Sequence, residues 1–147
     1  MEWAEVASQF AEDSSLRDIY ILDTTVDDWQ TVLDALRELD PSPVFSLNHE
    51  PSELPERAGD LLAKSADFGG LLKVNVGGMV IHCHPNGPDT IEFDILRSDV
   101  DGPDRLNVLA GFMERLANVT QKVVTLAHDG APEAVIGRAF PTVPRSE

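Results

Sequence analysis

The sequence predicts an α+β fold: a mostly antiparallel, mixed sheet with a three-strand meander, and helices packed mainly on one face. Three observations support this prediction. Apolar residues recur at helical spacing in several segments that turn residues separate. Two strand-like segments flank Gly77-Gly78, which is typical of a hairpin because both glycines tolerate positive φ. The strand that follows alternates apolar with acidic residues, as expected when one face of a sheet stays uncovered.

The helices are expected from their apolar stripes and their terminal residues. Trp3, Val6 and Phe10 share one face of a first helix. Thr25 and Asp28 have capping-box spacing at the start of a helix over 26–39. The other two expected helices begin at Ser52, as a cap, and at Pro103, and they extend to Gly69 and to residue 118.

The strands are expected from short apolar runs between turn signals. The run at 19–22 is apolar at successive positions, which is typical of a strand buried on both faces. The meander should contain 71–76, 79–84 and 90–96. The remaining expected strands are 44–47, 123–126 and an edge strand at 134–136.

Length and composition favour one domain in a reducing compartment. A chain of 147 residues fits a single globular domain over 1–147, in which 141–147 is expected to be a flexible tail. The one cysteine, Cys83, excludes an internal disulfide and fits the cytoplasm. The first residues have no basic and apolar leader, and no apolar run approaches the roughly 20 residues that span a bilayer. We therefore expect a cytoplasmic protein.

The charge balance limits the partners. The chain has 11 Lys and Arg against 26 Asp and Glu, for a formal net charge of −15. Such a surface repels nucleic acids and anionic membranes, because binding to either depends on cationic side chains. It attracts basic proteins and metal cations and speeds their arrival. Solubility alone is the alternative explanation of this charge.

His82 and His84 are the best candidates for chemistry. Residues two apart on a strand point to the same face, so the two imidazoles could converge on one ion. The next strand offers Glu92 or Asp94 as a third ligand, a donor set that suits zinc or ferrous iron. The alternative is a pair of surface histidines that contact nearby carboxylates. Cys83 points to the opposite face and is expected in the core.

The uncovered face of the meander is also the expected surface for a partner. Alternation assigns the following side chains to it: Lys73, Asn75, His82, His84, Glu92 and Asp94. Apart from Lys73, these are the residues that we expect to contact a partner. Val80 and Leu96 add apolar surface there, so the chain could be a monomer or a homodimer through the sheet.

Two acidic motifs resemble parts of known sites. Asp23 follows a strand and precedes a helix, where phosphatases place a nucleophile, but Thr25 stands where those enzymes have a second aspartate. Three aspartates near Gly102 resemble part of a calcium loop without its spacing, which indicates a turn with at most a weak cation site: Asp99, Asp101 and Asp104. No nucleotide-binding or nucleophile motif is present.

Three functions are compatible with these observations. The first is a non-catalytic acidic module that docks on a basic protein. In size, charge and lack of a catalytic motif, the chain resembles the small immunity proteins that bacteria keep against toxins, which implies inhibition of a basic toxin or nuclease. The second is a small metal-dependent enzyme built on His82, His84 and a carboxylate. The third is a small-molecule sensor or accessory domain with Tyr20, Trp29 and Phe45 around a pocket.

Overall fold

The strands form one antiparallel sheet in the order β3-β2-β4-β5-β6-β1-β7-β8. The computed structural model describes residues 1–10 and 16–143. The strands are β1 (Leu16–Leu22), β2 (Val44–Leu47), β3 (Glu50–Ser52), β4 (Gly70–Val76), β5 (Met79–His84), β6 (Thr90–Leu96), β7 (Val124–His128) and β8 (Ala131–Ala139). Each pairing between them is antiparallel, and β4, β5 and β6 are neighbours. The α+β class and the three-strand meander are confirmed.

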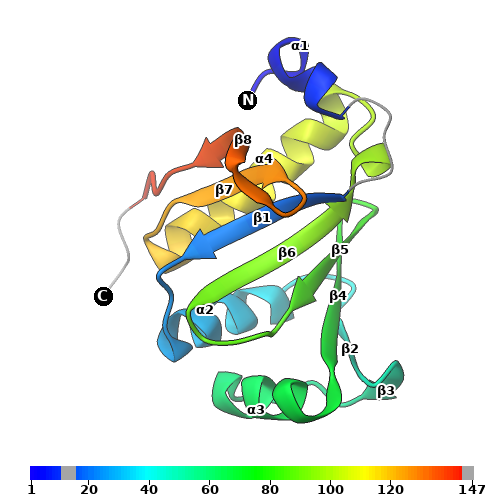
Figure 1. Cartoon of the computed structure of the whole chain (residues 1–147), viewed down its shortest axis with the longest axis vertical. Helices are drawn as coiled ribbons and strands as arrows, with labels where there is room; N and C mark the ends of the chain where they lie inside the picture. Colours follow the sequence, from blue (N-terminus) through cyan, green and yellow to red (C-terminus); the bar gives the residue numbers. More distant parts are fainter. Residues whose placement is uncertain (11–15, 144–147) are drawn as a thin grey trace.

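The helices cover one face of this sheet, as predicted. They are α1 (Trp3–Val6), η1 (Ala7–Phe10), α2 (Val26–Arg37), α3 (Ala58–Phe68), η2 (Arg97–Asp99) and α4 (Pro103–Thr120). Helices α2 and α4 lie together behind the sheet, and α1 lies at one end of the molecule (Figure 1). Val6 and Phe10 belong to the main hydrophobic core, so this N-terminal segment closes that end of the helical layer.

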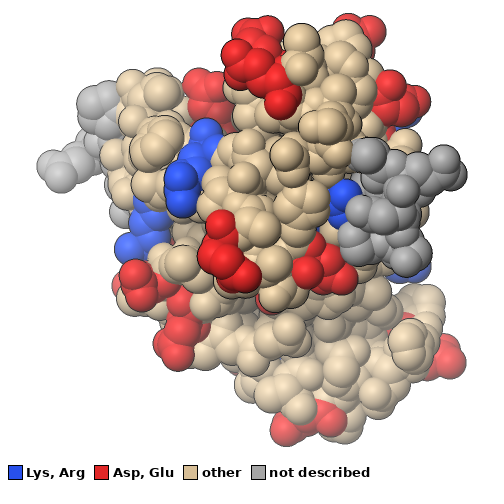
Figure 2. All heavy atoms as spheres, turned by 45° about the horizontal axis from the view of Figure 1, so that its top comes forward, with Lys and Arg blue, Asp and Glu red and all other residues tan. Residues whose placement is uncertain are grey.

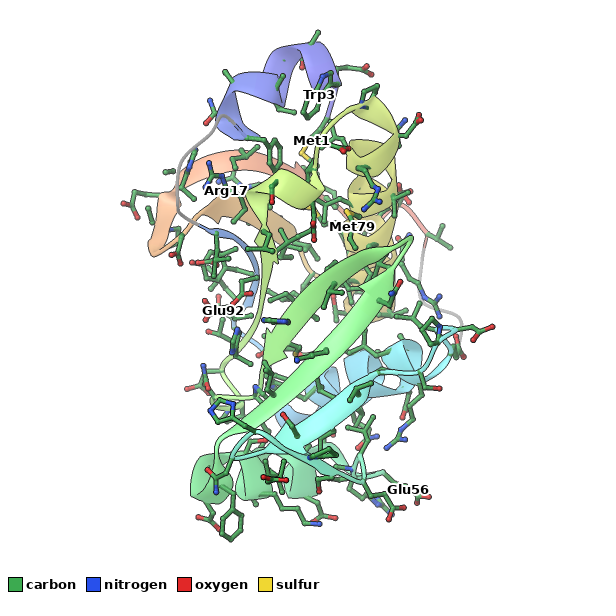
Figure 3. All side chains as sticks on the ribbon, turned by 90° about the vertical axis from the view of Figure 1, so that its right-hand side faces the viewer. Met1, Trp3, Arg17, Glu56, Met79 and Glu92 are labelled. Carbon is green, nitrogen blue, oxygen red and sulfur yellow. The ribbon has the colours of Figure 1, made fainter. Side chains whose placement is uncertain are left out.

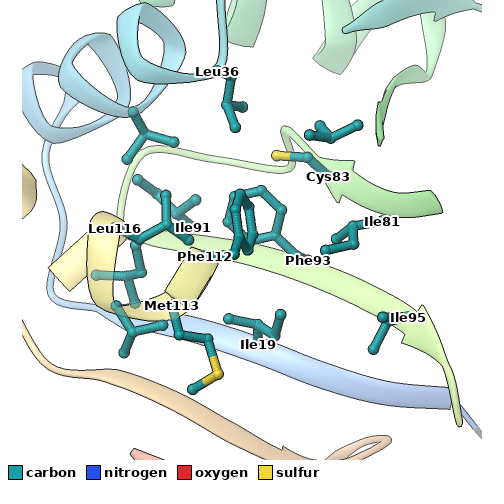
Figure 4. Close-up of a cluster of buried hydrophobic side chains, with 14 of the residues drawn as sticks. Ile19, Leu36, Ile81, Cys83, Ile91, Phe93, Ile95, Phe112, Met113 and Leu116 are labelled. Atoms are coloured by element: carbon teal, nitrogen blue, oxygen red, sulfur yellow. The ribbon is translucent and has the colours of Figure 1, made fainter. Parts of the chain in front are cut away.

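The core fills the space between α2, α3, α4 and the helix-facing side of the strands (Figure 4). Phe93 of β6 meets Phe112 of α4 edge to face, with ring centroids 5.6 Å apart and an interplanar angle of 86°. Trp29 is 1% exposed, so the stripe that predicted its burial is confirmed. Cys83 is buried on the helix side, as expected. Full burial of a large apolar side chain stabilises the fold by about 1.5–3 kcal/mol.

Two local predictions are confirmed in detail, and the end of α2 differs from the predicted one by two residues. Thr25 and Asp28 form a capping box: the Asp28 N–H donates to Oγ1 of Thr25 at 3.3 Å, and the Thr25 N–H donates to Oδ2 of Asp28 at 3.0 Å. Gly77 and Gly78 turn the β4–β5 hairpin with φ of 55° and 86°. Helix α2 ends at Arg37, two residues before the predicted end, ahead of Pro41.

The start of the third long helix was predicted wrongly. Ser52 does not cap it but lies in β3, opposite Phe45 of β2. Helix α3 begins at Ala58, whose N–H donates to Oε1 of Gln30 at 2.7 Å. The reason is Pro55, which has no N–H to donate and disfavours helical geometry in the residue before it.

The C-terminal strand is longer than the sequence indicated. Strand β8 covers Ala131–Ala139 rather than 134–136 alone, and it occupies the edge of the sheet, as expected. Its pairing with β7 shifts register on both sides of Ala127. Beyond it, the backbone N–H groups of Thr142 and Val143 donate to Oδ1 of Asn118 at 2.7 and 3.0 Å. Residues 144–147 lie outside the described residues, so the flexible tail stays a prediction.

Candidate binding site on the open face of the sheet

The sheet face that points away from α2 and α4 carries the candidate site, and we call it the open face. On β6, Ile91, Phe93 and Ile95 are buried against the helices. Glu92 and Asp94 point the other way and are partly exposed. Figure 3 shows the same contrast, with Met79 beside α4 and Glu92 away from it. The alternation that placed the acidic side chains on this face is therefore present in the fold.

His82, His84 and Asp94 meet at the centre of the open face. Strand register places His82 opposite Asp94 and His84 opposite Glu92. Nε2 of His84 lies 2.5 Å from Oδ2 of Asp94, whereas Nδ1 of His82 lies 3.7 Å from Oδ1 of the same carboxylate. The hydrogen bond from His84 to the Asp94 carboxylate raises the pKa of His84 above 6.5, and partial burial opposes this rise. The contact favours the imidazolium form of His84 at mildly acidic pH.

Two further residues join this site from β1: Asp18, which was not a candidate, and Tyr20, which was expected to line a pocket rather than to lie on the open face. Asp18 lies opposite Asp94, and Tyr20 lies opposite Glu92. The Tyr20 hydroxyl donates to Oδ2 of Asp18 at 2.8 Å, and the Gly130 N–H donates to the same oxygen at 3.1 Å. Asp18 is only 3% exposed. Burial raises its pKa above 3.8, although these two hydrogen bonds oppose the rise.

The sequence pattern that places Asp18 and Tyr20 on one face was overlooked, because the strand was expected to begin after Asp18. The expected strand began at Ile19, and its apolar run indicated burial on both faces. Strand β1 begins at Leu16 and is buried from Arg17 to Ile21, so the expected burial on both faces is confirmed. Residues two apart on a strand share a face, which places Asp18 and Tyr20 together. The burial of Asp18 could not be predicted, because it depends on the β7–β8 connection, which curls over β1 on the near side of the sheet (Figure 1).

Glu92 completes a group of three carboxylates, Asp18, Glu92 and Asp94, which we call the carboxylate cluster. Burial raises the pKa of Glu92 above 4.5, and the charges of Asp18 and Asp94 raise it further. The nearby charge of His84 acts in the opposite direction. A positive group beside Glu92 would therefore relieve repulsion that the fold alone leaves in place.

Lys73 and Asn75 lie on the part of the open face formed by β4. Lys73 is exposed and lies opposite His82. Asn75 has a role within the hairpin, because its Oδ1 accepts a hydrogen bond from the Gly78 N–H at 3.1 Å. Contact of Asn75 with a partner stays a prediction.

The predicted metal ligands do not form a metal-binding arrangement. Among residues 1–10 and 16–143, no group of three or more His, Cys, Asp or Glu side chains is placed to hold a metal ion. Asp94 instead lies within hydrogen-bonding distance of His84 and faces His82. The metal site expected at His82, His84, Glu92 and Asp94 therefore stays a prediction.

A cavity of about 240 Å³ adjoins the carboxylate cluster at the β5–β6 end of the open face. Apart from Gly87, its lining residues have polar side chains: His84, Asn86, Gly87, Asp89, Thr90 and Glu92. Trp29 and Thr24 fix its backbone, because the Trp29 indole N–H donates to the Gly87 carbonyl at 2.9 Å and the Thr24 N–H donates to the Asp89 carbonyl at 3.0 Å. This cavity was not predicted, since it depends on the path of the turn between the two strands.

The other candidate residues lie apart from this cavity. Asp23 is exposed, with a φ of 56°, in the connection between β1 and α2. The three aspartates near Gly102 lie in η2, in the segment after it and in the first turn of α4. Trp29 and Phe45 are buried in the core, and Tyr20 contacts Asp18, so these three aromatic residues do not surround a common pocket.

Comparisons with known proteins add no assignment to this geometry. No protein-family model matches the chain, and neither the curated proteins nor the solved structures give a match to it. Within the described part of the chain, no helix combines the length and the apolar character needed to span a bilayer.

Proposed function

We propose that this chain is a non-catalytic acidic module whose open face binds a basic segment of another protein. The observation that carries the proposal is the carboxylate cluster, in which Asp18, Glu92 and Asp94 gather on the two central strands β1 and β6. The partner class that suits it best is a basic toxin or nuclease, which the module would inhibit as an immunity protein does. Cationic side chains would fill the face and neutralise these charges.

The charge of the whole chain supports the same choice of partner. The net charge is −15, and acidic side chains recur from the top to the bottom of the view in Figure 2. Basic side chains occupy less of that surface. A negative field of this extent attracts a basic protein from a distance and raises the association rate. Excess charge thus speeds the encounter, and the carboxylate cluster defines where the partner binds.

The partly buried state of the cluster gives a second reason for a cationic partner. Each carboxylate has lost some solvation, and Asp18 and Asp94 lie near enough to Glu92 for their charges to raise its pKa. An arriving lysine or arginine replaces the missing solvation with a charge-assisted hydrogen bond. A cation should therefore bind more favourably at this face than at an isolated, exposed carboxylate.

The first experiment identifies the partner and then measures its association directly. Proteins captured on the immobilised chain are identified, and the candidates with basic isoelectric points are purified and mixed with it in a stopped-flow instrument. We expect the association rate constant to fall steeply between about 0.05 M and 0.5 M salt, because the Debye length shortens over this range. We also expect Glu92→Gln and Asp94→Asn to slow association and speed dissociation.

Matched controls separate the open face from the general charge. Glu56→Gln and Asp67→Asn remove the same groups from exposed positions outside the open face, before and within α3. Each control should lower the association rate constant only by the small amount that the loss of one negative charge from the whole surface causes. A rate constant indifferent to salt, or equal losses in the open-face and control variants, would contradict the proposal.

The metal-dependent enzyme is the alternative, and one observation favours it: His82 and His84 both approach Asp94. Elemental analysis of the purified protein decides between the two. Stoichiometric zinc or iron that is lost in the His82→Ala, His84→Ala double variant would support the enzyme. A folded, metal-free protein that binds a basic partner would exclude it. Light scattering on the same sample distinguishes a monomer from a homodimer.

A further inference from the structure

We propose that the cavity lined by His84, Asn86, Asp89, Thr90 and Glu92 receives the guanidinium group of one arginine of the partner. The inference rests on the proposed function and names the side chain that anchors it. The cavity is about 240 Å³, which leaves room for the end of one long side chain. It adjoins the carboxylate cluster, so the charge of Asp94 would also attract a cation bound in the cavity.

The lining suits a planar cation with several donors. Glu92 and Asp89 contribute two carboxylates, and Asn86 and Thr90 contribute an amide and a hydroxyl. A guanidinium has five N–H donors and no acceptor, so it can use more of these acceptors at once than any other side chain. His84 also lines the cavity, and its ring offers a face for the guanidinium plane when the imidazole is neutral, whereas the imidazolium form that Asp94 favours repels a cation.

A lysine or a bare metal ion suits the cavity less well. An ammonium has three donors and is strongly hydrated, so it gains less from the dispersed acceptors of a shallow polar cavity. For a metal ion, no group of three or more donor side chains is suitably placed within the part of the chain that the structure describes. The geometry therefore favours arginine among the cations that a protein partner can offer.

The wall of the cavity is held in place before any partner arrives. The turn that carries Asn86, Gly87 and Asp89 is fixed by hydrogen bonds from Trp29 to the Gly87 carbonyl and from the Thr24 N–H to the Asp89 carbonyl. The Thr24 hydroxyl also donates to the Pro88 carbonyl at 2.5 Å. Because Trp29 is buried in the core, the turn has a rigid support. A preorganised wall reduces the entropy lost on binding.

The experiment is an NMR titration of the ¹⁵N-labelled protein with three blocked amino acids. N-acetyl-arginine amide is the probe, N-acetyl-lysine amide tests the preference for guanidinium, and N-acetyl-citrulline amide has nearly the same shape without the charge. We expect the arginine probe to shift the amides of Asn86, Gly87 and Thr90 and the indole N–H of Trp29. The lysine probe should bind more weakly, and the citrulline probe should leave these signals unchanged.

Two variants and one control test the acceptors. Glu92→Gln should weaken the arginine probe by about tenfold, the effect of losing one charge-assisted hydrogen bond. Asp89→Asn changes an exposed turn residue and serves as the second variant if Glu92→Gln disturbs the sheet. Glu56→Gln should bind the probe like the unmodified protein. The inference is overturned by equal responses to arginine and citrulline, by a response that neither variant weakens, or by no response at these amides.

The outcome is separable from that of the proposed function. If the arginine probe binds as expected but no basic protein associates with the open face, the cavity stands and the docking role fails. If a basic protein binds the open face while the arginine probe gives no response, the docking role stands and this cavity is not its anchor.

Discussion

The indole N–H of Trp29 donates to the carbonyl oxygen of Gly87 at 2.9 Å, and this contact joins the buried face of α2 to the turn between β5 and β6. Trp29 is thus both a core residue and the support of the candidate cavity. Substitutions that keep the packing but remove the donor, or that remove both, distinguish the two roles.

Trp29→Phe should destabilise the protein less than Trp29→Ala. Phenylalanine keeps most of the apolar contacts and loses the hydrogen bond to Gly87, worth about 0.5–1.5 kcal/mol, together with part of the packing. Alanine also leaves a cavity and should cost about 3–5 kcal/mol. The free energy of unfolding in urea measures both values. As a control, Val26→Ala on the exposed side of α2 should change the free energy of unfolding by no more than about 0.5 kcal/mol. A loss below about 1 kcal/mol for Trp29→Ala would show that this side chain is not packed in the core.

The burial of Trp29 was predicted correctly and the helix cap at Ser52 was predicted wrongly, for different physical reasons. The stripe of α2 and its capping box between Thr25 and Asp28 are local, and local patterns largely decide such a helix. Strand β3 pairs with β2 across a two-residue turn, Asn48-His49, in which both residues have positive φ, and this hairpin signal was not recognised in the sequence. The apolar-acidic alternation of β6 likewise predicted which side chains the open face would hold.

Only part of the candidate site could be predicted, because strand alternation is a local pattern and strand order is not. His82, His84, Glu92 and Asp94 could be assigned to one face because a strand alternates. Asp18 reaches the same face only because β1 inserts between β6 and β7, which is a matter of strand order. Its burial requires the backbone of Gly130, which is distant in sequence.

The hairpin turn at Gly77 gives a second prediction. Gly77 has a φ of 55°, and a Cβ there would lie 2.7 Å from Cγ1 of Val108. Gly77→Ala should therefore cost at least about 1–2 kcal/mol, the strain of an L-residue in the left-handed region. Gly111→Ala should instead stabilise the protein by about 0.5–1 kcal/mol, because this helical position in α4 has no heavy atom within 4 Å of the added Cβ. Thermal unfolding of both variants checks the opposite signs, and equal shifts would contradict the argument.

The buried carboxyl of Asp18 predicts a pH dependence. Its pKa in the fold is raised above 3.8, chiefly by burial, so ionisation of this carboxyl costs more in the fold than in the unfolded chain. The stability linked to this group is fully present below the unfolded-state pKa and is lost as pH rises through the folded-state value. Asp18→Asn stays neutral, and its carbonyl oxygen can accept from both Tyr20 and Gly130, since both donate to one oxygen of Asp18. The variant should gain stability relative to the wild type as pH increases from 4 to 7.

Urea unfolding at several pH values measures this gain. Asp67→Asn makes the same change on the exposed surface of α3 and serves as the control. If Asp18→Asn lost stability relative to the wild type as pH rose, the carboxylate of Asp18 would have to stabilise the fold, contrary to the effect of its burial.

Cys83 gives a prediction that reports on the sheet itself. Its side chain is fully buried on the helix side of β5, and burial raises the pKa of its thiol, which suppresses the reactive thiolate. The native protein should therefore resist an aromatic disulfide reagent at neutral pH and react once unfolded in urea. The fraction that reacts in a short pulse should follow the unfolding curve measured by circular dichroism. Rapid labelling in native buffer would instead mean that β5 opens locally, without global unfolding, at the strand that carries His82 and His84.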